Sequence, residues 1–375
     1  MQIKIFLTRE RQVVYLIKIL AFFWFITKAW TYKAWVVDRE YPVIAPSEAL
    51  DHIPGSVHIV LLFFSFLALL AILMLKQNRF LLTLLFAAEL LSCALDTVRW
   101  QPWEYMYLCI LLVLIINFMK PQNIILLVHW LLVSVYLFSG LHKFSRVFLS
   151  EVWVKMILTG YLHFPLPLIL TYKLFFAGLL IPLTEIMLAA LLYRMKNKKP
   201  VSYMLVFMHL GILLLIGPFG LQYNSVVWFW NLFMICLLFV VYRQPLPVQD
   251  RRFCIRQAYW TVIWFILPVF SFSGMWYQYF SFNLYSGKNA YLYICFPQRP
   301  AMKSIFIKLP HYANHENQKE VCIGLQDWAM AEMSLVPLPE PEIYRKIAER
   351  LKQKYAGLRV SVFLYNPVTG KRTDL

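Results

Sequence analysis

The sequence predicts an all-α polytopic membrane bundle of about nine transmembrane helices, followed by a small C-terminal α/β extramembrane domain. Three observations predict this fold class. The 375-residue chain is 61% hydrophobic with a mean hydropathy of +0.61, whereas soluble domains are nearer ~45–50% apolar. Apolar runs long enough to span a bilayer recur up to residue 275. Beyond that point these runs stop and charges of both signs mix, so we predict two domains, 1–275 and 276–375.

Nine apolar segments are predicted to cross the membrane. The first follows Arg9 and Arg11, lacks a cleavable signal pattern and is expected to be an uncleaved helix. Lys18 and Lys28 lie near its two ends, where long side chains snorkel to the headgroups. The nine segments are 12–30, 57–75, 80–96, 103–118, 123–141, 172–192, 201–218, 225–241 and 258–272.

The distribution of basic residues predicts the orientation. If the N-terminus lies inside, the inner connections hold most of the Lys and Arg, including the dense cluster 194–199. An odd number of spans then places the C-terminal domain outside. We therefore expect a multi-pass protein of a cell inner membrane, with a cytoplasmic N-terminus and a periplasmic C-terminal domain. The same rule accounts for the net charge of +17, and no nucleic acid partner is expected because no basic stripe with interleaved aromatics lies outside the membrane.

The C-terminal domain is predicted from short patterns. Segments 290–296, 304–307 and 358–365 are expected to be strands, and 340–354 an amphipathic helix with Ile343, Ile347 and Leu351 on one face. The six cysteines contain no C-x-x-C pair, which excludes the usual zinc and thioredoxin motifs. Cys295 and Cys322 both fall on the oxidising side, so a disulfide between them is an open alternative.

Ionisable residues inside apolar spans are the first candidates for function, because such groups are costly in a bilayer unless they face the bundle interior. They are Glu89, His129, Glu185 and His209. On the fifth span His129, Tyr136 and Lys143 recur at seven-residue intervals and share one helix face. That face is either a polar ladder toward a site or ordinary packing, with Lys143 as a boundary charge.

The later spans offer further candidates, each with a structural alternative. Glu185 follows Pro182, which can kink the helix and free a carbonyl. His209 lies near mid-span, and Trp228 and Asn231 open the eighth span as an apolar wall and a hydrogen-bonding group. Each also fits a packing or aromatic-belt role.

Segment 143–171 is long and apolar and is expected to lie on the membrane or fold over a cavity. No metal-ligand cluster, nucleophile elbow or phosphate-binding loop is present, so no metal is expected.

One stretch carries a family resemblance. The segment 136–144, with its Phe138-Ser139-Gly140-Leu141-His142-Lys143 core and Trp153 downstream, resembles the motif of the vitamin K-dependent gamma-carboxylase-like membrane family (HTTM domain). Segments 207–209, 224–231 and 279–287 are also similar to parts of that family, so the resemblance covers residues 10–290. It implies that Lys143 is a base that receives a proton when a reduced quinone reacts with oxygen.

Two departures limit what the resemblance implies. The family's His near Trp103 is missing, and the large lumenal domain that binds the protein substrate is absent, so protein carboxylation is not expected. What remains is a quinone or other lipidic ligand in an outward-facing cavity, with proton abstraction or quinone-linked oxidation. The expected catalytic residues are Lys143, His209 and Glu185; the expected cofactor-binding residues are Asn231, Trp228, Tyr136 and His142.

A non-enzymatic role is the alternative. The chain would then be a membrane partner whose C-terminal domain docks another protein, and Lys143 only an interface anchor. A transporter is disfavoured, because the sequence shows no inverted repeat and no matched pair of broken helices.

Overall fold

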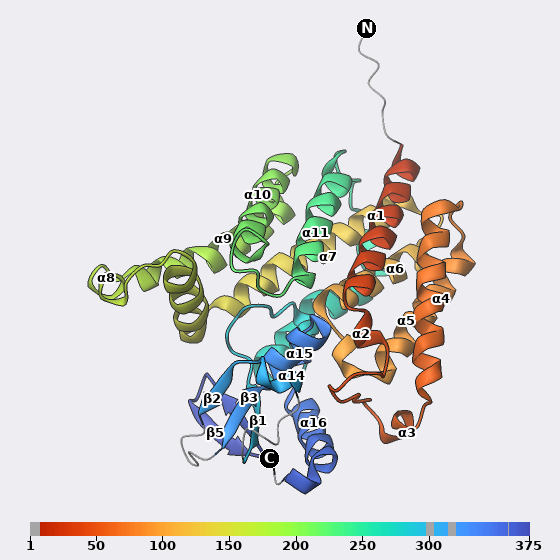
Figure 1. Ribbon diagram of the computed structural model, residues 1–375. Helices are drawn as coiled ribbons and strands as arrows, with labels where there is room; N and C mark the ends of the chain where they lie inside the picture. Colours follow the sequence, from red (N-terminus) through yellow and green to blue (C-terminus); the bar gives the residue numbers. More distant parts are fainter. Residues whose placement is uncertain (1–7, 298–303, 314–319, 359) are drawn as a thin grey trace.

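The computed structural model describes residues 8–297, 304–313, 320–358 and 360–375. It is mostly helical, with a bundle of long helices and a small antiparallel sheet at the end opposite the N-terminus (Figure 1). Each of the nine predicted apolar segments is largely helical. Among the described residues, five helical segments are long and apolar enough to cross a membrane: α1 (Arg9–Trp30), α4 (Gly55–Met74), α7 (Pro121–Lys143), Leu174–Arg194 and α10 (Lys199–Ile216).

The other predicted spans are helices shorter than these five. They are α5 (Arg79–Leu95), α6 (Pro102–Ile116), α11 (Val226–Tyr242) and the segment Ala258–Ser273, which begins as α13 (Ala258–Thr261). Short helices connect the long ones: α2 (Tyr32–Trp35), α3 (Glu48–Asp51), α8 (Leu166–Thr171) and α12 (Arg251–Arg256). The α9 helix proper is Leu180–Arg194, and a short 3₁₀ helix, Leu174–Leu179, precedes it.

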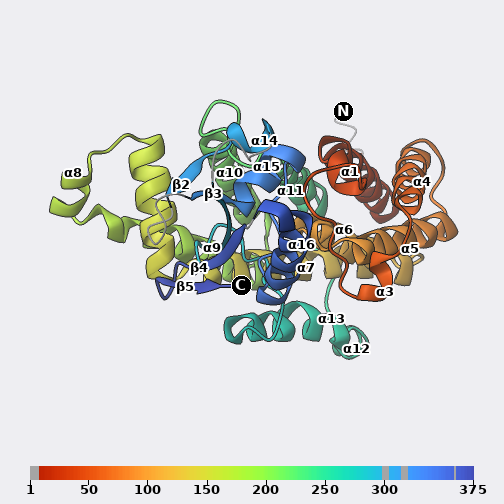
Figure 2. The ribbon, with the colours of Figure 1, turned by 60° about the horizontal axis from the view of Figure 1, so that its bottom comes forward.

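Helix α7 is the centre of the bundle (Figure 2). It contacts α1, α6, α9 and α11, and every residue from Ile124 to Tyr136 is buried. A helix that is apolar all round is expected at such a position. Polar groups between Ile124 and Tyr136 are therefore surrounded by protein, and each needs a partner there.

After α7 the chain forms a lateral arm, residues 148–179. A π-helical segment, Phe148–Tyr161, leads to α8, which projects away from the bundle (Figures 1 and 2). Trp153 closes the base of the arm: its indole N–H donates to the Leu174 carbonyl at 2.9 Å. Gly178 lies against the Trp153 ring, where a Cβ would meet Cγ at 2.5 Å. The arm is thus tied to the start of α9, and it contributes to a cavity described below.

The C-terminal sheet has the order β2-β3-β1-β4-β5 and is antiparallel throughout. Cys295 and Cys322 lie opposite each other in the β1–β3 register and form a disulfide.

The predicted amphipathic helix is confirmed, with Ile343, Ile347 and Leu351 buried. The elements are β1 (Tyr291–Phe296), α14 (Ser304–Ile307), β2 (His311–Ala313), β3 (Val321–Gly324), α15 (Leu325–Met333), α16 (Pro341–Lys354), β4 (Ser361–Asn366) and β5 (Lys371–Asp374).

The predicted strand at 304–307 is wrong, because this segment is a helical turn. Its chain turns back through a bond from the Leu309 N–H to the Phe306 carbonyl at 3.2 Å. Phe306 packs against Phe296 and Trp328, with ring centroids 5.3 and 4.8 Å away. A four-residue segment is too short for its hydrophobic periodicity to distinguish a strand from a helix. Tertiary packing therefore determined the structure of this segment.

The expectation that Lys28 snorkels is also wrong. Its side chain is 1% exposed, and Nζ lies 2.8 Å from Glu89 Oε2, whose residue is fully buried. The ammonium also lies 2.9 Å from the centroid of the Trp35 ring. Lys18, on the same helix, is half-buried and donates to the Leu73 carbonyl at 2.9 Å. The counter-charge of Lys28 is Glu89, which lies on another helix, α5. The sequence pattern of α1 alone does not reveal this partner.

The C-terminal domain is held to the bundle through two carboxylates, the half-buried Glu332 and the buried Glu340. Glu332 accepts hydrogen bonds from the backbone N–H groups of Glu40 at 2.6 Å and Tyr41 at 2.9 Å. Glu340, which directly precedes α16, accepts from the backbone N–H of Gln278 at 2.6 Å and is 7% exposed. Burial raises the pKa of Glu340 to about 7, against the pull of that hydrogen bond.

Glu340 predicts a pH dependence for this contact. A carboxyl group whose pKa is higher in the folded state than in the unfolded chain binds more protons when folded, so stability falls as pH rises between about 4.5 and 7. Glu340→Gln keeps the acceptor oxygen and removes the charge. We expect it to raise the free energy of unfolding by about 1–3 kcal/mol at pH 8 and to have little effect at pH 4.5. Thermal unfolding of both proteins across this range is the measurement, and an equal gain at both pH values would contradict it.

Candidate functional site

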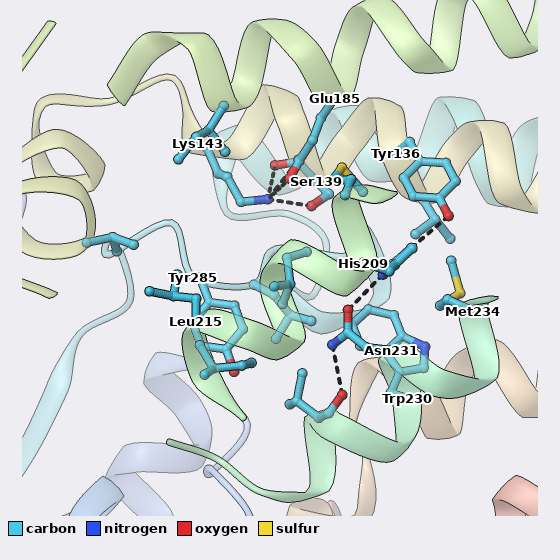
Figure 3. A pocket seen from close by; sticks show the side chains of 18 of the residues that line it. Tyr136, Ser139, Lys143, Glu185, His209, Leu215, Trp230, Asn231, Met234 and Tyr285 are labelled. Carbon is cyan, nitrogen blue, oxygen red and sulfur yellow. Dashed lines mark hydrogen bonds and ion pairs between the residues drawn. The ribbon is translucent and has the colours of Figure 1, made fainter. Parts of the chain in front are cut away.

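An apolar cavity of about 150 Å³ lies at the end of the bundle nearest the C-terminal domain (Figure 3). Helices α7, α9, α10 and α11, the lateral arm and the segment before β1 enclose it. Most of its lining is aliphatic or aromatic. The polar side chains that line it are Tyr136, Ser139, Lys143, Glu185, His209, Asn231, Trp230 and Tyr285.

Lys143 is held at this cavity by a buried ion pair. Its Nζ lies 2.7 and 2.9 Å from the two carboxylate oxygens of Glu185, and 2.6 Å from the hydroxyl of Ser139. The side chains of Lys143 and Glu185 are 9% and 6% exposed. Ser139 precedes Lys143 by four residues and therefore shares its helix face. All three donor positions of the ammonium are directed at oxygen atoms, so the pair is fully hydrogen-bonded on the lysine side.

The ion pair depends on a close approach of α7 to α9 at Gly140. A Cβ at this position would lie 2.8 Å from Ile186 Cγ1, 3.0 Å from the Pro182 carbonyl and 3.1 Å from Glu185 Cβ. Only a residue without a side chain fits there. The glycine of the family-like motif therefore lets Glu185 reach Lys143, a role that the sequence alone did not reveal.

We expect Gly140→Ala to destabilise the protein by about 1–3 kcal/mol, because the added methyl group overpacks the α7–α9 contact. Gly211→Ala on α10 is the matched control, since a Cβ there meets nothing within 4 Å. Replacing an exposed mid-helix glycine by alanine is neutral or stabilising by up to about 1 kcal/mol. Thermal unfolding in detergent compares the two variants. Equal stability of both would show that the α7–α9 contact does not need Gly140.

A second polar group lines the same cavity from α10 and α11. The Asn231 amide donates through Nδ2 to the Val227 carbonyl at 2.8 Å, so its Oδ1 is left to accept from His209 Nδ1 at 2.7 Å. His209 Nε2 then accepts from the Tyr136 hydroxyl at 2.9 Å. The chain of bonds specifies the tautomer of His209 with hydrogen on Nδ1. Tyr136, His209 and Asn231 form one ordered network across three helices.

Not every predicted residue lies at the cavity. The His142 ring stacks on Phe272 with centroids 4.4 Å apart, and its Nε2 lies 3.2 Å from the Ser271 hydroxyl. Successive residues of an α-helix are rotated by about 100° around its axis, so the side chains of His142 and Lys143 point in different directions. Trp228 instead donates to the Ile216 carbonyl at 2.8 Å, and Trp230 takes the position at the cavity wall.

The predicted polar ladder of α7 is divided in the same way. Tyr136 and Lys143 line the cavity, whereas His129 bonds to the Tyr242 hydroxyl at 2.8 Å. Glu89 lies in another part of the bundle, paired with Lys28. Sequence reasoning missed Ser139, which helical spacing from Lys143 indicates, and Tyr285, whose left-handed backbone (φ 54°) leaves no signal in the sequence.

Comparison of the chain with models of known families, with curated proteins and with solved structures finds no match. Within residues 8–297, 304–313, 320–358 and 360–375, no group of three or more His, Cys, Asp or Glu side chains is arranged to hold a metal ion. What the structure shows at the site is an ion pair and a histidine network beside an apolar cavity.

Proposed function

We propose that this chain is a multi-pass inner-membrane protein of the vitamin K-dependent carboxylase-like (HTTM) family that binds a quinone or another ring-headed lipidic ligand. Its chemistry would be proton abstraction or quinone-linked oxidation, with Lys143 as base. The observation that carries the proposal is the position of the Lys143–Glu185 pair and of the His209–Asn231 pair on one apolar cavity (Figure 3). Buried charges in a membrane bundle that line a cavity are a typical mark of a functional site.

The cavity supports a ligand with a flat ring. Its volume of about 150 Å³ is that of an engineered cavity that binds benzene. Aliphatic and aromatic side chains surround this space, while the polar groups belong to two separate networks, one on Lys143 and one on His209. A quinone ring has an apolar plane and two oxygen atoms on opposite edges, so it matches both features.

Proton transfer follows from the same contacts. A lysine acts as a base only as the free amine, and the Glu185 carboxylate, 2.7 Å from Nζ, is placed to take its proton. The amine would then accept a proton from a hydroxyl of the reduced quinone, which leaves the quinol anion and the ammonium. Glu185 thus has a role as proton acceptor beyond neutralising Lys143.

The proposal includes about nine crossings and an outer position for the site. The N-terminal end of α1 and the α4–α5 connection lie at one end of the bundle, and the sheet lies at the other (Figure 1). Basic residues gather at the first of these ends, which supports a cytoplasmic assignment for it. The cavity and the C-terminal domain would then face the periplasm.

Mass spectrometry of copurifying quinones and lipids tests the function. We expect a quinone with the wild-type protein, its loss from Lys143→Ala, and its retention in Lys155→Ala. Lys155 pairs with Glu151 on the arm, where the lysine side chain is 67% exposed, and it serves as the matched control. The double variant Lys143→Met with Glu185→Leu, which removes both charges, should also lose the quinone. A wild-type preparation without any quinone, or one whose quinone content is unchanged in both variants at Lys143, would overturn the proposal.

A further inference from the structure

A second cavity, of about 410 Å³, lies beside the first and has a different chemistry. The two share the residues Val152, Met156, Leu284 and Tyr285. The first cavity lies among the helices, whereas the second lies between the arm, the loop that precedes α11 and the C-terminal domain, which contributes Tyr291, Gln326 and Val336. Its volume falls in the ~300–1,000 Å³ range of small-molecule sites.

The second cavity is polar but not positively charged. Among the described residues that line it, none is Lys, Arg or His. Glu151 is the charged side chain on its wall, and its carboxylate is 2.7 Å from Lys155 Nζ. Phosphates and carboxylates are recognised through cationic donors, so an anionic ligand has no counter-charge here. Five carboxamide side chains line the cavity instead: Gln101, Asn224, Asn283, Asn289 and Gln326.

Two of these carboxamides, Asn224 and Asn283, are incompletely satisfied, because each has a buried Oδ1 without a hydrogen-bond partner among the described residues. Asn283 is 1% exposed, and its Nδ2 donates to Gln278 Oε1 at 2.6 Å. Its Oδ1 is buried and has no hydrogen-bond partner among the described residues. Leaving such an acceptor unpaired costs about 1–3 kcal/mol. A ligand hydroxyl that reaches either oxygen would remove that cost.

Aromatic rings complete the lining. Trp103, Tyr223, Tyr279 and Tyr291 present flat apolar faces with polar tips. A sugar ring has an apolar C–H face for such rings, and its hydroxyl groups both donate and accept, as carboxamides do. An extended peptide is less well matched, because β1 is already paired with β3 and β4 and has no free edge.

We propose that this second cavity binds a neutral polyhydroxylated molecule with the chemistry of a sugar ring. Carboxamides and tyrosines supply the hydrogen bonds, and Asn283 Oδ1 accepts from one ligand hydroxyl. The site goes beyond the proposed function, since it needs neither Lys143 nor a quinone. Because the cavities share a wall, a polar molecule in the second would lie next to the ring in the first.

Saturation-transfer NMR on the full chain in lipid nanodiscs tests the site with three water-soluble probes. They are methyl β-D-glucoside, glucose 6-phosphate as the anionic counterpart, and tetramethylammonium as a cation. We expect saturable binding of the glucoside and no specific binding of the other two. Asn283→Leu should weaken glucoside binding about tenfold, the equivalent of one lost hydrogen bond to a buried acceptor. Asn197→Leu, at an exposed position outside the cavity, should leave binding unchanged.

Asn289→Leu is a second variant in the same cavity and decides the question if Asn283→Leu does not fold. Preferential binding of glucose 6-phosphate or tetramethylammonium would overturn the proposal, as would glucoside binding that neither cavity variant weakens. Quinone content measured on the same preparations separates the two proposals, because the asparagine variants are expected to keep it.

Discussion

Replacing Lys143 by methionine is expected to lower the free energy of unfolding by about 3–5 kcal/mol, because it leaves the Glu185 carboxylate buried without its partner. Glu185 is 5% exposed and loses both of its short contacts to Nζ. Methionine has a similar length and keeps the packing of the lysine stem. Chemical or thermal unfolding in detergent gives the difference from the wild type.

Lys155→Met provides the control for a charge pair of the same composition. The Lys155–Glu151 pair is 67% and 35% exposed, and exposed pairs contribute about 0–1 kcal/mol. The double variant Lys143→Met with Glu185→Leu should regain most of the lost free energy of unfolding, because it also removes the Glu185 carboxylate that Lys143→Met leaves unpaired. If Lys143→Met proves as mild as Lys155→Met, the pair is solvated in the working protein and the buried-base mechanism fails with it.

Lys28→Met is expected to have an effect of the same size, about 3–5 kcal/mol, for the same physical reason. Glu89 is fully buried and Lys28 is 1% exposed, so the carboxylate has no route to water when its partner is removed. The variant also loses the contact of the ammonium with the Trp35 ring. Unfolding in detergent measures the change, with circular dichroism at low denaturant to show whether the bundle still forms.

Lys18→Met, on the same helix, is the matched control. Lys18 is half-buried and bonds to a carbonyl rather than to a carboxylate, so its loss should cost about 1 kcal/mol. A Lys28 variant no less stable than the Lys18 variant would mean that Glu89 is not charged when Lys28 is absent. Adding Glu89→Gln to Lys28→Met would then cause no further change, which the same unfolding experiment shows.

The two buried pairs differ in what surrounds them, and this difference bears on function. The Lys143–Glu185 pair lines a cavity together with His209 and Asn231. The Lys28–Glu89 pair lies near a second group of buried charges, in which Arg99 bonds to Ser92 and lies 2.7 Å from His58 Nδ1. That group joins α4, α5 and the segment after α5, so it fastens helices together. The first pair therefore lies where the proposed function needs a charged group, whereas the second pair lies within helix-to-helix packing.

The structure shows what surrounds Trp103, near which the carboxylase-like family has a histidine that this sequence lacks. Here Trp103 lies against Trp230 with ring centroids 6.4 Å apart, and Glu104 accepts from the Trp24 indole at 2.9 Å. Trp103 lines the second cavity and Trp230 the first. The position at which the sequence departs from the family motif thus lies between the two cavities.

The sequence by itself determined which segments are apolar helices, because bilayer-length runs and the helical period are local properties of the chain. It also indicated that Tyr136 and Lys143 share a face of α7 and that 340–354 is amphipathic. The tertiary structure decided the partners. Lys28 meets Glu89 and Lys143 meets Glu185 because separate helices pack together, and Gly140 sets how closely α7 and α9 approach. His142 and Trp228 turn away while Ser139 and Trp230 face the cavity, since packing chooses which side of a uniformly apolar helix is inside.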